Sequence, residues 1–377
     1  PAAGAGALGG VAGGSGGSGT TGTGTTGAGA TGAGAAVGGG AGGNPAAAAR
    51  PPSAAVVAAA AHDVTPSLVD LDTALSYEGL QAAGTGIVFG RSGLVLTNNH
   101  VIEGETSLTA VDVATGRRYR GVVVGYDMAS DVAVVRLVGA PGLPVARFAP
   151  GSAHLGQQVV AVGNAGGRGG APTAAGGTVT GLDRSITASD QGGGTVEQLS
   201  GLISTNADVQ LGDSGGSLVD AAGQVLGVDT ATLRGVAFSG TGHEGFAIPI
   251  ATAMAIAHRI LAGQGSATVH VGPTAFIGVR ASASSCSAGA PGTSVTQGSG
   301  ALVCDVIPDT GASAAGLVPG DLITALSGFP VRTPASLTHL LVERFHPGET
   351  VTVSFRGADG RGAGRGAAVT LGSGPPA

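Results

Sequence analysis

Short apolar runs separated by glycine-rich turns make up most of the chain after residue 62. Ile87–Phe89 and Leu94–Leu96 are two such runs, and the turn-forming segment Gly90–Gly93 between them predicts a β-hairpin. Many short strands at close spacing indicate a barrel or a sandwich, and hence a mainly β fold. Similar runs are expected to form strands at Gly121–Val124, Val132–Leu137, Gln158–Gly163, Gly177–Leu182, Leu218–Asp229 and Gly245–Ile250.

Two segments carry apolar residues at the spacing of a helix instead. Ile250–Leu261 reads IATAMAIAHRIL, which predicts a helix that closes the strand-rich region. Nearer the C-terminus, Thr333 can cap a helix that has Pro334 at its first position, and leucines recur along it at helical spacing.

The first 62 residues are mostly Gly, Ala, Thr and Ser, and contain few of the large apolar side chains whose burial offsets the entropy lost on ordering. We therefore expect a disordered linker over residues 1–62. This stretch has no signal-peptide pattern and no apolar span of about 20 residues. Neither a signal peptide nor a membrane helix is expected within the chain, which leaves open that an upstream signal or anchor has been removed.

Length and charge narrow the classes of function. The chain has 377 residues, enough for two domains plus tails at roughly 100 to 200 residues per domain. Its formal net charge is −6, and its 17 basic residues are all arginine and form no cluster. A nucleic-acid-binding surface needs a positive patch, so we expect no nucleic acid as a partner.

Cys286 and Cys304, the two cysteines of the chain, flank a stretch rich in Gly, Ser and Pro. A metal site would need further ligands, so a disulfide across a loop is the better interpretation. A disulfide indicates an oxidising, extracytoplasmic compartment. His243-Glu244 lacks the second histidine of a zinc-binding helix, and we expect neither a metal nor another cofactor.

The segment QLGDSGGSLVD, residues 210–220, places Ser214 between glycines. Gly212 can adopt backbone angles closed to other residues, so that its N–H and that of Ser214 could point into one small cavity and bind an oxyanion. A serine hydroxyl is a weak nucleophile until a base takes its proton. On its own, the segment is equally compatible with a glycine-rich turn.

Two residues can supply the required base and acid. His100 follows an expected strand in VLTNNHVI, at a corner where a fixed side chain can face a cleft. Asp131, in ASDVAVVRL, precedes a strongly apolar strand, where a carboxylate needs a partner because burying it unpaired is costly. Taken alone, the histidine could be structural and the aspartate a turn residue. The order His100, Asp131, Ser214 is that of the chymotrypsin-type triad.

Four ordered motifs carry a resemblance to the HtrA family of serine proteases: LTNNHVI, SDVAVVRL, GDSGGSLVD and GFAIPI. The resemblance implies a chymotrypsin-like pair of six-stranded barrels over residues 63–265. It makes His100 the general base, Asp131 its orienting acid and Ser214 the nucleophile, with Gly212 and Ser214 forming the oxyanion hole. The chain departs from the family at two positions near the serine. Asp213 stands where the family more commonly has asparagine, and Ser217 stands where proline is frequent.

A substrate pocket is also implied by the resemblance. Asp208 lies six positions before Ser214, an offset at which trypsin-like enzymes carry the aspartate that binds basic residues and HtrA relatives more often carry a small or apolar one. An inward-facing Asp208 would favour basic substrates, whereas neutralisation by Arg184 or Arg234 would leave an apolar pocket. We expect cleavage after small or medium aliphatic residues, in a pocket formed by Asp208, Phe246, Ala247 and Ile248.

The C-terminal part resembles a PDZ domain over residues 270–373. FIGVRA is followed by VIPDTGASAAGLVPGDLITALSGFPV and by TPASLTHLLVERFHPGETVTVSFRG. Such domains add an extended peptide to an exposed sheet edge, and its terminal carboxylate meets backbone N–H groups. Leu337 and Leu341 would either line the helical wall of this groove or pack in the core. The carboxylate-binding loop and edge strand would comprise Phe276, Ile277, Gly278 and Val279.

Two functions are compatible with these expectations. The first is an extracytoplasmic serine endopeptidase that cleaves unfolded, misfolded or signalling proteins through an acyl-enzyme, while a PDZ domain selects exposed C-terminal peptides. The second is a chaperone or peptide-binding scaffold with little proteolytic role; a missing triad member would favour it, and none is missing. The resemblance suggests a homotrimer. We expect the protein in the periplasm, at the cell surface or secreted. Any membrane anchor would have to be a segment absent from this chain.

Overall fold

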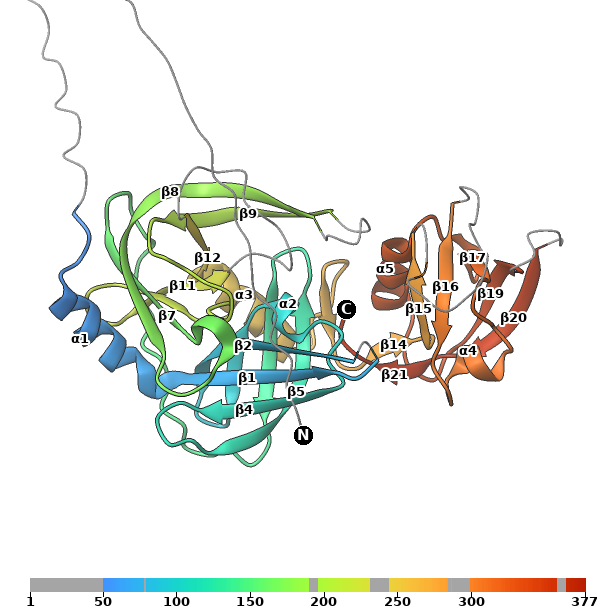
Figure 1. Cartoon of the computed structure of the whole chain (residues 1–377), viewed down its shortest axis with the longest axis horizontal. Helices are drawn as coiled ribbons and strands as arrows, with labels where there is room; N and C mark the ends of the chain where they lie inside the picture. The colour runs from blue at the N-terminus through green and yellow to red at the C-terminus, as the bar shows by residue number, and fades with distance from the viewer. Residues whose placement is uncertain are drawn as a thin grey trace, which may run out of the picture. The chain divides into compact units, whose positions relative to one another are not determined.

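The computed structural model describes residues 50–77, 79–189, 196–230, 244–283, 286, 299–357 and 364–377. Within these ranges the fold is mainly β, as predicted, with two barrels followed by a C-terminal sheet (Figure 1). No helix of the described ranges is both long enough and apolar enough to cross a membrane. Most of the expected linker, residues 1–49, lies outside them.

Six strands form the first barrel: β1 (Leu68–Leu75), β2 (Leu80–Gly90), β3 (Leu94–Thr97), β4 (Ser107–Asp112), β5 (Arg118–Asp127) and β6 (Val132–Leu137). The strands pair antiparallel in the order β5-β4-β1-β2-β3-β6, and pairing of β5 with β6 closes the barrel. Alternate residues of β4 are buried, as expected for a strand with one face toward a core. Apolar side chains such as Leu71, Tyr126 and Val135 fill the interior.

Six further strands form a second closed barrel: β7 (Gln158–Gly163), β8 (Thr173–Ser189), β9 (Val196–Thr205), β10 (Ser217–Val219), β11 (Val225–Thr230) and β12 (Gly245–Pro249). The single strand predicted over Leu218–Asp229 is wrong, because a tight turn separates β10 from β11. The Asp220 side chain accepts hydrogen bonds from the N–H groups of Ala222 and Gln224, and Gly223 has a φ of 67°.

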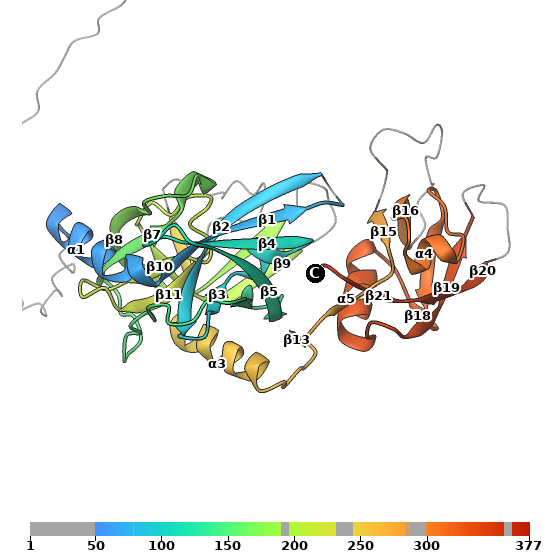
Figure 2. The same cartoon turned by 90° about the horizontal axis from the view of Figure 1, so that it is seen from below.

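Helix α3 (Ile250–Leu261) has the predicted bounds. It contacts β11 of the second barrel and both β5 and β6 of the first, so it packs across the two barrels (Figure 2). After α3, β13 (Val269–Val271) pairs with the end of β5. The remaining short helical segments of this region are α2 (Asn99–Ile102) and the 3-10 turns η1 (Thr65–Ser67) and η2 (Ala165–Gly167).

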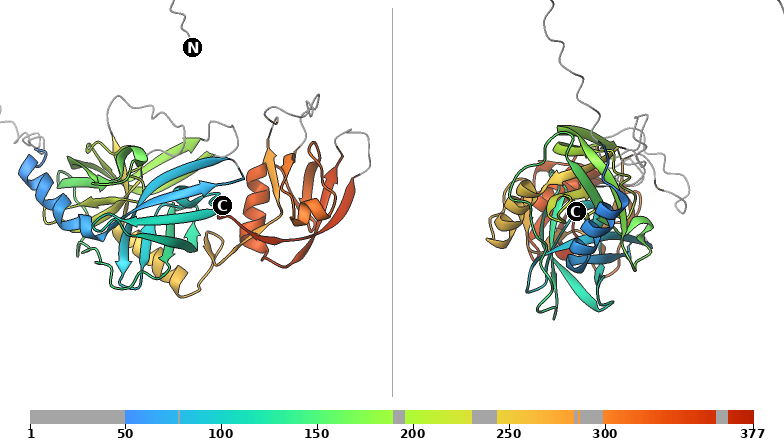
Figure 3. Two further views of the ribbon diagram at one scale, coloured as in Figure 1. Left: turned by 60° about the horizontal axis from the view of Figure 1, so that its bottom comes forward. Right: turned by 90° about the vertical axis from the view of Figure 1, so that its left-hand side faces the viewer.

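The predicted linker is wrong at its C-terminal end, because helix α1 (Ala54–Val64) begins at residue 54. The Ser53 side chain caps it by accepting a hydrogen bond from the Val56 N–H. Ala60 and Val64 are buried, and α1, blue in Figure 3, packs against β7, β8 and β10. Alanine favours helices, and the second barrel supplies an apolar surface that composition alone did not reveal.

The C-terminal sheet has the strand order β15-β16-β17-β19-β20, with β15 (Val279–Ser282) at one edge. Beside this path, β18 (Phe329–Pro330) pairs with β17, and a separate two-stranded ladder joins β14 (Thr274–Phe276) to β21 (Gly372–Gly374). The other elements are β16 (Ala301–Val306), β17 (Leu322–Leu326), β19 (Thr350–Arg356), β20 (Arg365–Thr370), α4 (Gly311–Ala314) and α5 (Pro334–Arg344).

Helix α5 begins as predicted. Thr333 is its N-cap, Pro334 is its first residue, and the side chains of Thr333 and Ser336 form a reciprocal capping box. The helix then packs on the sheet through Leu337 and Leu341, which are buried.

The predicted disulfide between Cys286 and Cys304 is present. Cys304 belongs to β16, and the bond closes a loop with a sequence separation of 18 residues. The cross-link therefore ties the segment after β15 to the neighbouring strand of the C-terminal sheet.

Asp70 is a buried carboxyl group on β1. It is 3% exposed, and its Oδ2 accepts a hydrogen bond from the Gly170 N–H at 3.2 Å. Burial raises the pKa of Asp70 to about 6, the Gly170 hydrogen bond opposes this shift, and the nearby charge of Asp72 adds to it. The ionised form is thus penalised in the folded protein.

We expect reduction of the Cys286–Cys304 disulfide to lower the free energy of unfolding of the C-terminal sheet by about 3 kcal/mol, the chain-entropy value for a loop of this size. Denaturant titration followed by hydrogen exchange, with and without reductant, measures the loss and locates it. Both barrels, which contain no cysteine, serve as the internal control. Two free thiols in protein taken from its native compartment would contradict the prediction.

Substitution of Asp70 by asparagine is expected to stabilise the protein at pH 8. A carboxyl whose folded pKa lies above its unfolded value destabilises the fold once it is ionised, so stability falls as pH rises from about 4 to about 6. Asp70→Asn should gain on the order of 1 kcal/mol above pH 6, and the gain should vanish below pH 4. Thermal unfolding across this pH range tests it, with Asp183→Asn, at an exposed aspartate that does not contribute to the Asp70 shift, as control; a gain that is independent of pH would refute the assignment.

Candidate active site

His100 and Asp131 come from two neighbouring corners of the first barrel, and their side chains are in contact. His100 lies in α2, the helical turn that follows β3, and Asp131 lies in the turn between β5 and β6. The His100 Nδ1 is 2.9 Å from Asp131 Oδ2 and 3.0 Å from Oδ1, and the His100 backbone N–H donates to Oδ1 at 3.0 Å. The fold thus brings together the predicted base and the predicted acid.

The carboxylate of Asp131 has a further donor from the second barrel. Asp131 is 2% exposed, so its oxygens need hydrogen-bond donors. The Thr230 hydroxyl, at the end of β11, donates to Oδ2 at 3.1 Å, and the Asn98 side-chain amide donates to the Asp131 carbonyl oxygen at 2.9 Å. Nothing in the sequence marked Thr230 or Asn98, since threonine is common in strands and asparagine in turns.

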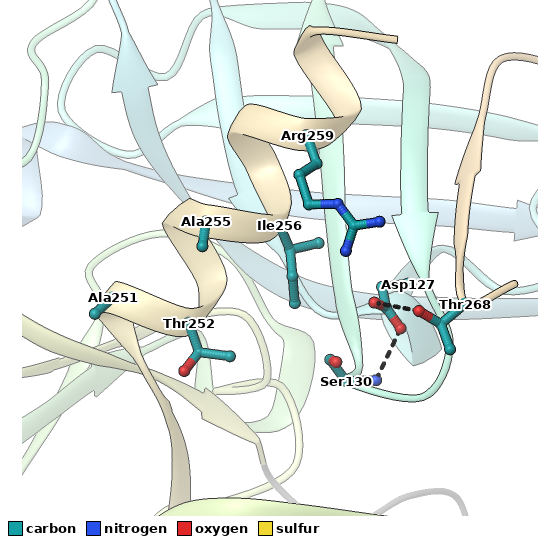
Figure 4. Close-up of a pocket in the computed structure, with 8 residues that line it drawn as sticks. All are labelled: Asp127, Ser130, Ala251, Thr252, Ala255, Ile256, Arg259 and Thr268. Carbon is teal, nitrogen blue, oxygen red and sulfur yellow. Dashed lines mark hydrogen bonds between the residues drawn. The ribbon is translucent and has the colours of Figure 1, made fainter. Parts of the chain in front are cut away.

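Asp127 holds the turn that carries Asp131. One of its carboxylate oxygens accepts from the Ser130 N–H at 3.1 Å and the other from the Thr268 hydroxyl at 3.2 Å (Figure 4). Burial raises the pKa of Asp127, and these hydrogen bonds oppose the shift. The three side chains face α3 across an open pocket, whose other lining residues are Ala251, Thr252, Ala255, Ile256 and Arg259.

Ser214 lies in the loop between β9 and β10 and is 4% exposed. Gly212, two residues earlier, has a φ of 96°. A side chain at Gly212 would overlap the carbonyl oxygen of Asn164 and come within 2.7 Å of the Gly167 nitrogen. Only glycine fits this backbone, as the motif predicted.

The peptide groups that contain the Gly212 and Ser214 N–H groups are held through their carbonyl oxygens. Because the N–H and C=O of a trans peptide point in opposite directions, each N–H points away from the group that binds its carbonyl. The Gly166 N–H donates a hydrogen bond to the Leu211 carbonyl oxygen at 2.6 Å. The Gly216 N–H donates one to the Asp213 carbonyl oxygen at 2.7 Å.

Two buried carboxyl groups flank the serine loop. Asp213 accepts hydrogen bonds from the Gln210 N–H at 2.9 Å and the Thr173 hydroxyl at 3.3 Å. Burial nevertheless raises the pKa of Asp213, and the charge of Asp208 adds to the shift. Asp229 is 0% exposed, and neither of its carboxyl oxygens has a partner among the described residues. Burial, and secondly the charge of Asp213, raise the pKa of Asp229 well above its usual value, which favours the neutral acid.

Asp208 lies on the surface of the same loop. The Gln210 side-chain amide donates to its Oδ2 at 2.8 Å. Arg234, one of the two arginines expected to neutralise Asp208, lies outside the described residues, as does the rest of segment 231–243.

The three β12 residues assigned to the substrate pocket face opposite ways. Phe246 and Ile248 pack in one core cluster, whereas Ala247 packs in another. Successive side chains of a strand alternate between its faces, so Ala247 points away from Phe246 and Ile248, and a substrate pocket formed by these residues and Asp208 stays a prediction.

The residues assigned to the peptide groove lie where β14 passes into β15. Phe276 ends β14, Gly278 has a φ of 91°, and Val279 begins the edge strand β15. Leu337 and Leu341 are 4% and 7% exposed and belong to the same core cluster as Ile277. Their burial favours core packing, and a role in a groove stays a prediction.

Residues 84–228 match the family model of the trypsin-like peptidase domain. This segment includes His100, Asp131 and Ser214.

Curated relatives of the chain are named serine proteases. Serine protease PepD of Mycobacterium tuberculosis is 32% identical over 326 residues, which cover 83% of this chain and 65% of PepD. Periplasmic serine endoprotease DegP of Salmonella typhimurium is 32% identical over 259 residues, which cover 68% of this chain and 50% of DegP. The chain therefore spans between half and two thirds of the length of these relatives.

Solved structures of similar proteins include a serine endoprotease from Yersinia pestis, 23% identical, with 84% of this chain and 97% of that chain covered and a TM-score of 0.46. Another is the HtrA-type protease AlgW with a tripeptide, which is 26% identical, with 85% of this chain and 98% of that chain covered and a TM-score of 0.46. Residues 84–228 are therefore a trypsin-like peptidase segment, and over most of its length the chain is similar to named serine proteases.

Proposed function

We propose that the protein is a serine endopeptidase in which Ser214 is the nucleophile, His100 the general base and Asp131 the acid that orients it. The observation that carries the proposal is the contact of 2.9 Å between His100 Nδ1 and the buried Asp131 carboxylate. A structural histidine needs no such partner from another turn of the barrel, whereas a catalytic imidazole must be held in one tautomer and one orientation.

The tautomer of His100 follows from its partner. An ionised carboxylate can only accept hydrogen bonds, so the proton of the neutral ring lies on Nδ1 and leaves Nε2 as the basic nitrogen. When the Ser214 hydroxyl attacks a peptide carbonyl carbon, Nε2 takes its proton. The Asp131 carboxylate then stabilises the imidazolium without accepting the proton itself.

The N–H groups of Gly212 and Ser214 are proposed to bind the oxyanion. Formation of the Oγ–C bond moves negative charge onto the carbonyl oxygen, and two fixed donors stabilise that charge most effectively. Support comes from the positive φ of Gly212 and from the engagement of both neighbouring carbonyl oxygens, Leu211 and Asp213.

Collapse of the tetrahedral intermediate breaks the peptide C–N bond. The imidazolium of His100 gives its proton to the leaving amine, and the acyl group stays on Ser214 as an ester. Water then attacks the ester while Nε2 takes one of its protons, and collapse returns that proton to the serine oxygen. Both half-reactions balance with the residues of this chain and water.

We also propose that residues 270–373 form a PDZ domain that binds C-terminal peptides. Support comes from the position of β15 at an edge of the sheet, where an extended peptide can add as a further strand. The Gly278 backbone, with its φ of 91°, turns the chain just before this edge. Peptide binding by the edge and helix α5 remains the test of this assignment.

The substrates are proposed to be unfolded, misfolded or signalling proteins outside the cytoplasm. The disulfide of the C-terminal sheet suits an oxidising compartment, and the similar protease DegP is named periplasmic. A homotrimer stays a prediction from the family resemblance, and sedimentation equilibrium tests it.

Replacing Ser214 by alanine should abolish hydrolysis of an unfolded protein such as casein. Loss of one member of a cooperative triad costs on the order of 10⁶-fold in kcat, while the fold should be unchanged. Release of casein fragments and labelling by a fluorophosphonate measure the loss, with thermal unfolding as the check on folding. Near-normal cleavage by Ser214→Ala would end the proposal, and an inert wild-type protein that still binds peptides would favour the scaffold function.

A second expectation concerns the residue before the cleaved bond. Asp208 is exposed, and its carboxylate accepts a hydrogen bond from the Gln210 side-chain amide. We infer that this carboxylate does not face the substrate pocket, and we therefore expect cleavage after small or medium aliphatic residues. Asp208→Ala should change the preference by less than about tenfold, with Asp220→Ala as the control for removing a loop carboxylate. A peptide-library profile dominated by arginine or lysine, and lost in Asp208→Ala, would show instead that Asp208 faces the pocket.

A further inference from the structure

Thr85, on β2, connects the first barrel to the loop that carries Ser214. It is 1% exposed. Its N–H donates to the Ser214 carbonyl oxygen at 2.8 Å, and its hydroxyl donates to the Gly212 carbonyl oxygen at 2.9 Å. Its own carbonyl oxygen accepts a hydrogen bond from the Thr97 hydroxyl on β3 at 2.7 Å, which fixes Thr85 within its barrel.

The same hydroxyl also binds a second loop. It accepts a hydrogen bond from the Asn164 N–H at 2.9 Å. Asn164 opens the segment that contains Gly166, whose N–H holds the Leu211 carbonyl oxygen. A hydroxyl has one proton and two lone pairs, so Thr85 uses its donor on the serine loop and its acceptor on the neighbouring loop.

The geometry gives this hydroxyl a place next to the proposed oxyanion hole. The peptide group between Gly212 and Asp213 separates the two N–H groups assigned to the oxyanion, and Thr85 holds its carbonyl oxygen. Rotation of that peptide would change the relative direction of the Gly212 and Ser214 N–H groups. Oxyanion stabilisation depends on donors that are fixed before the charge develops.

We propose that Thr85 is a positioning residue whose hydroxyl keeps the N–H groups of Gly212 and Ser214 aligned. The inference rests on the proposed function, because this alignment matters only when Ser214 is the nucleophile. Valine has nearly the shape of threonine but no hydroxyl. It would leave the Gly212 carbonyl oxygen and the Asn164 N–H, both on buried residues, without this partner.

Fluorophosphonate labelling tests the inference without a known substrate. In this reaction the Ser214 hydroxyl gives its proton to His100, its oxygen bonds to phosphorus and fluoride leaves, while the phosphoryl oxygen occupies the oxyanion site. The rate at saturating probe and the probe concentration at half-maximal rate are measured for wild type, Thr85→Val and Thr85→Ser. Thr73→Val is the matched control, because Thr73 on β1 is 2% exposed and its hydroxyl donates to the Ala82 carbonyl oxygen at 3.1 Å.

We expect Thr85→Val to lower the saturating rate by roughly tenfold or more, with the half-maximal concentration changed by less than about twofold. Thr85→Ser and Thr73→Val should react like wild type. A merely structural loss would lower thermal stability in Thr85→Val and Thr73→Val alike without this split between rate and affinity.

Full reactivity of Thr85→Val, or an equal loss in Thr85→Ser, would overturn the proposal. If Thr85→Val does not fold, Thr85→Ala makes the same comparison. If neither folds, the hydroxyl is required for folding and not for alignment, which also overturns it. An unlabelled wild-type protein would instead refute the proposed function, so the two failures are distinguishable.

Discussion

Burial of the Asp131 carboxylate is the constraint on which the rest of the site depends. At 2% exposure, a carboxylate must find donors within the protein. It finds them in the ring and backbone of His100 and in the hydroxyl of Thr230. Because Thr230 belongs to the second barrel, pairing this one group also joins the two barrels at the site.

The glycines around Ser214 are explained by close contacts with both barrels. A side chain at Gly215 would overlap the Thr85 carbonyl oxygen and the Thr97 hydroxyl, and the Gly215 N–H donates to the Asp229 carbonyl oxygen at 2.9 Å. At Gly216 it would come within 2.6 Å of the Val162 carbonyl oxygen. Close approach of protein backbone therefore requires these glycines, independently of any substrate.

Local patterns predicted the elements whose geometry a few neighbouring residues fix. The cap at Thr333 placed α5, helical spacing gave the bounds of α3, and the two cysteines could pair only with each other. Prediction was wrong where burial came from elsewhere in the chain. Helix α1 looked like part of a linker because the surface it packs on belongs to strands roughly 100 to 160 residues later.

The sequence by itself predicted His100, Asp131 and Ser214 as a triad, from residue types that the chemistry requires in any fold and from their chymotrypsin-type order, and it determined the need for glycine at position 212. Only the tertiary structure decided which residues hydrogen-bond to these groups and hold them in place. Thr230 and Asp131 are 99 positions apart, and Thr85 and Gly212 are 127 apart. Contacts of such separation leave no local pattern, so a threonine on a strand acquires its role only when two barrels close around it.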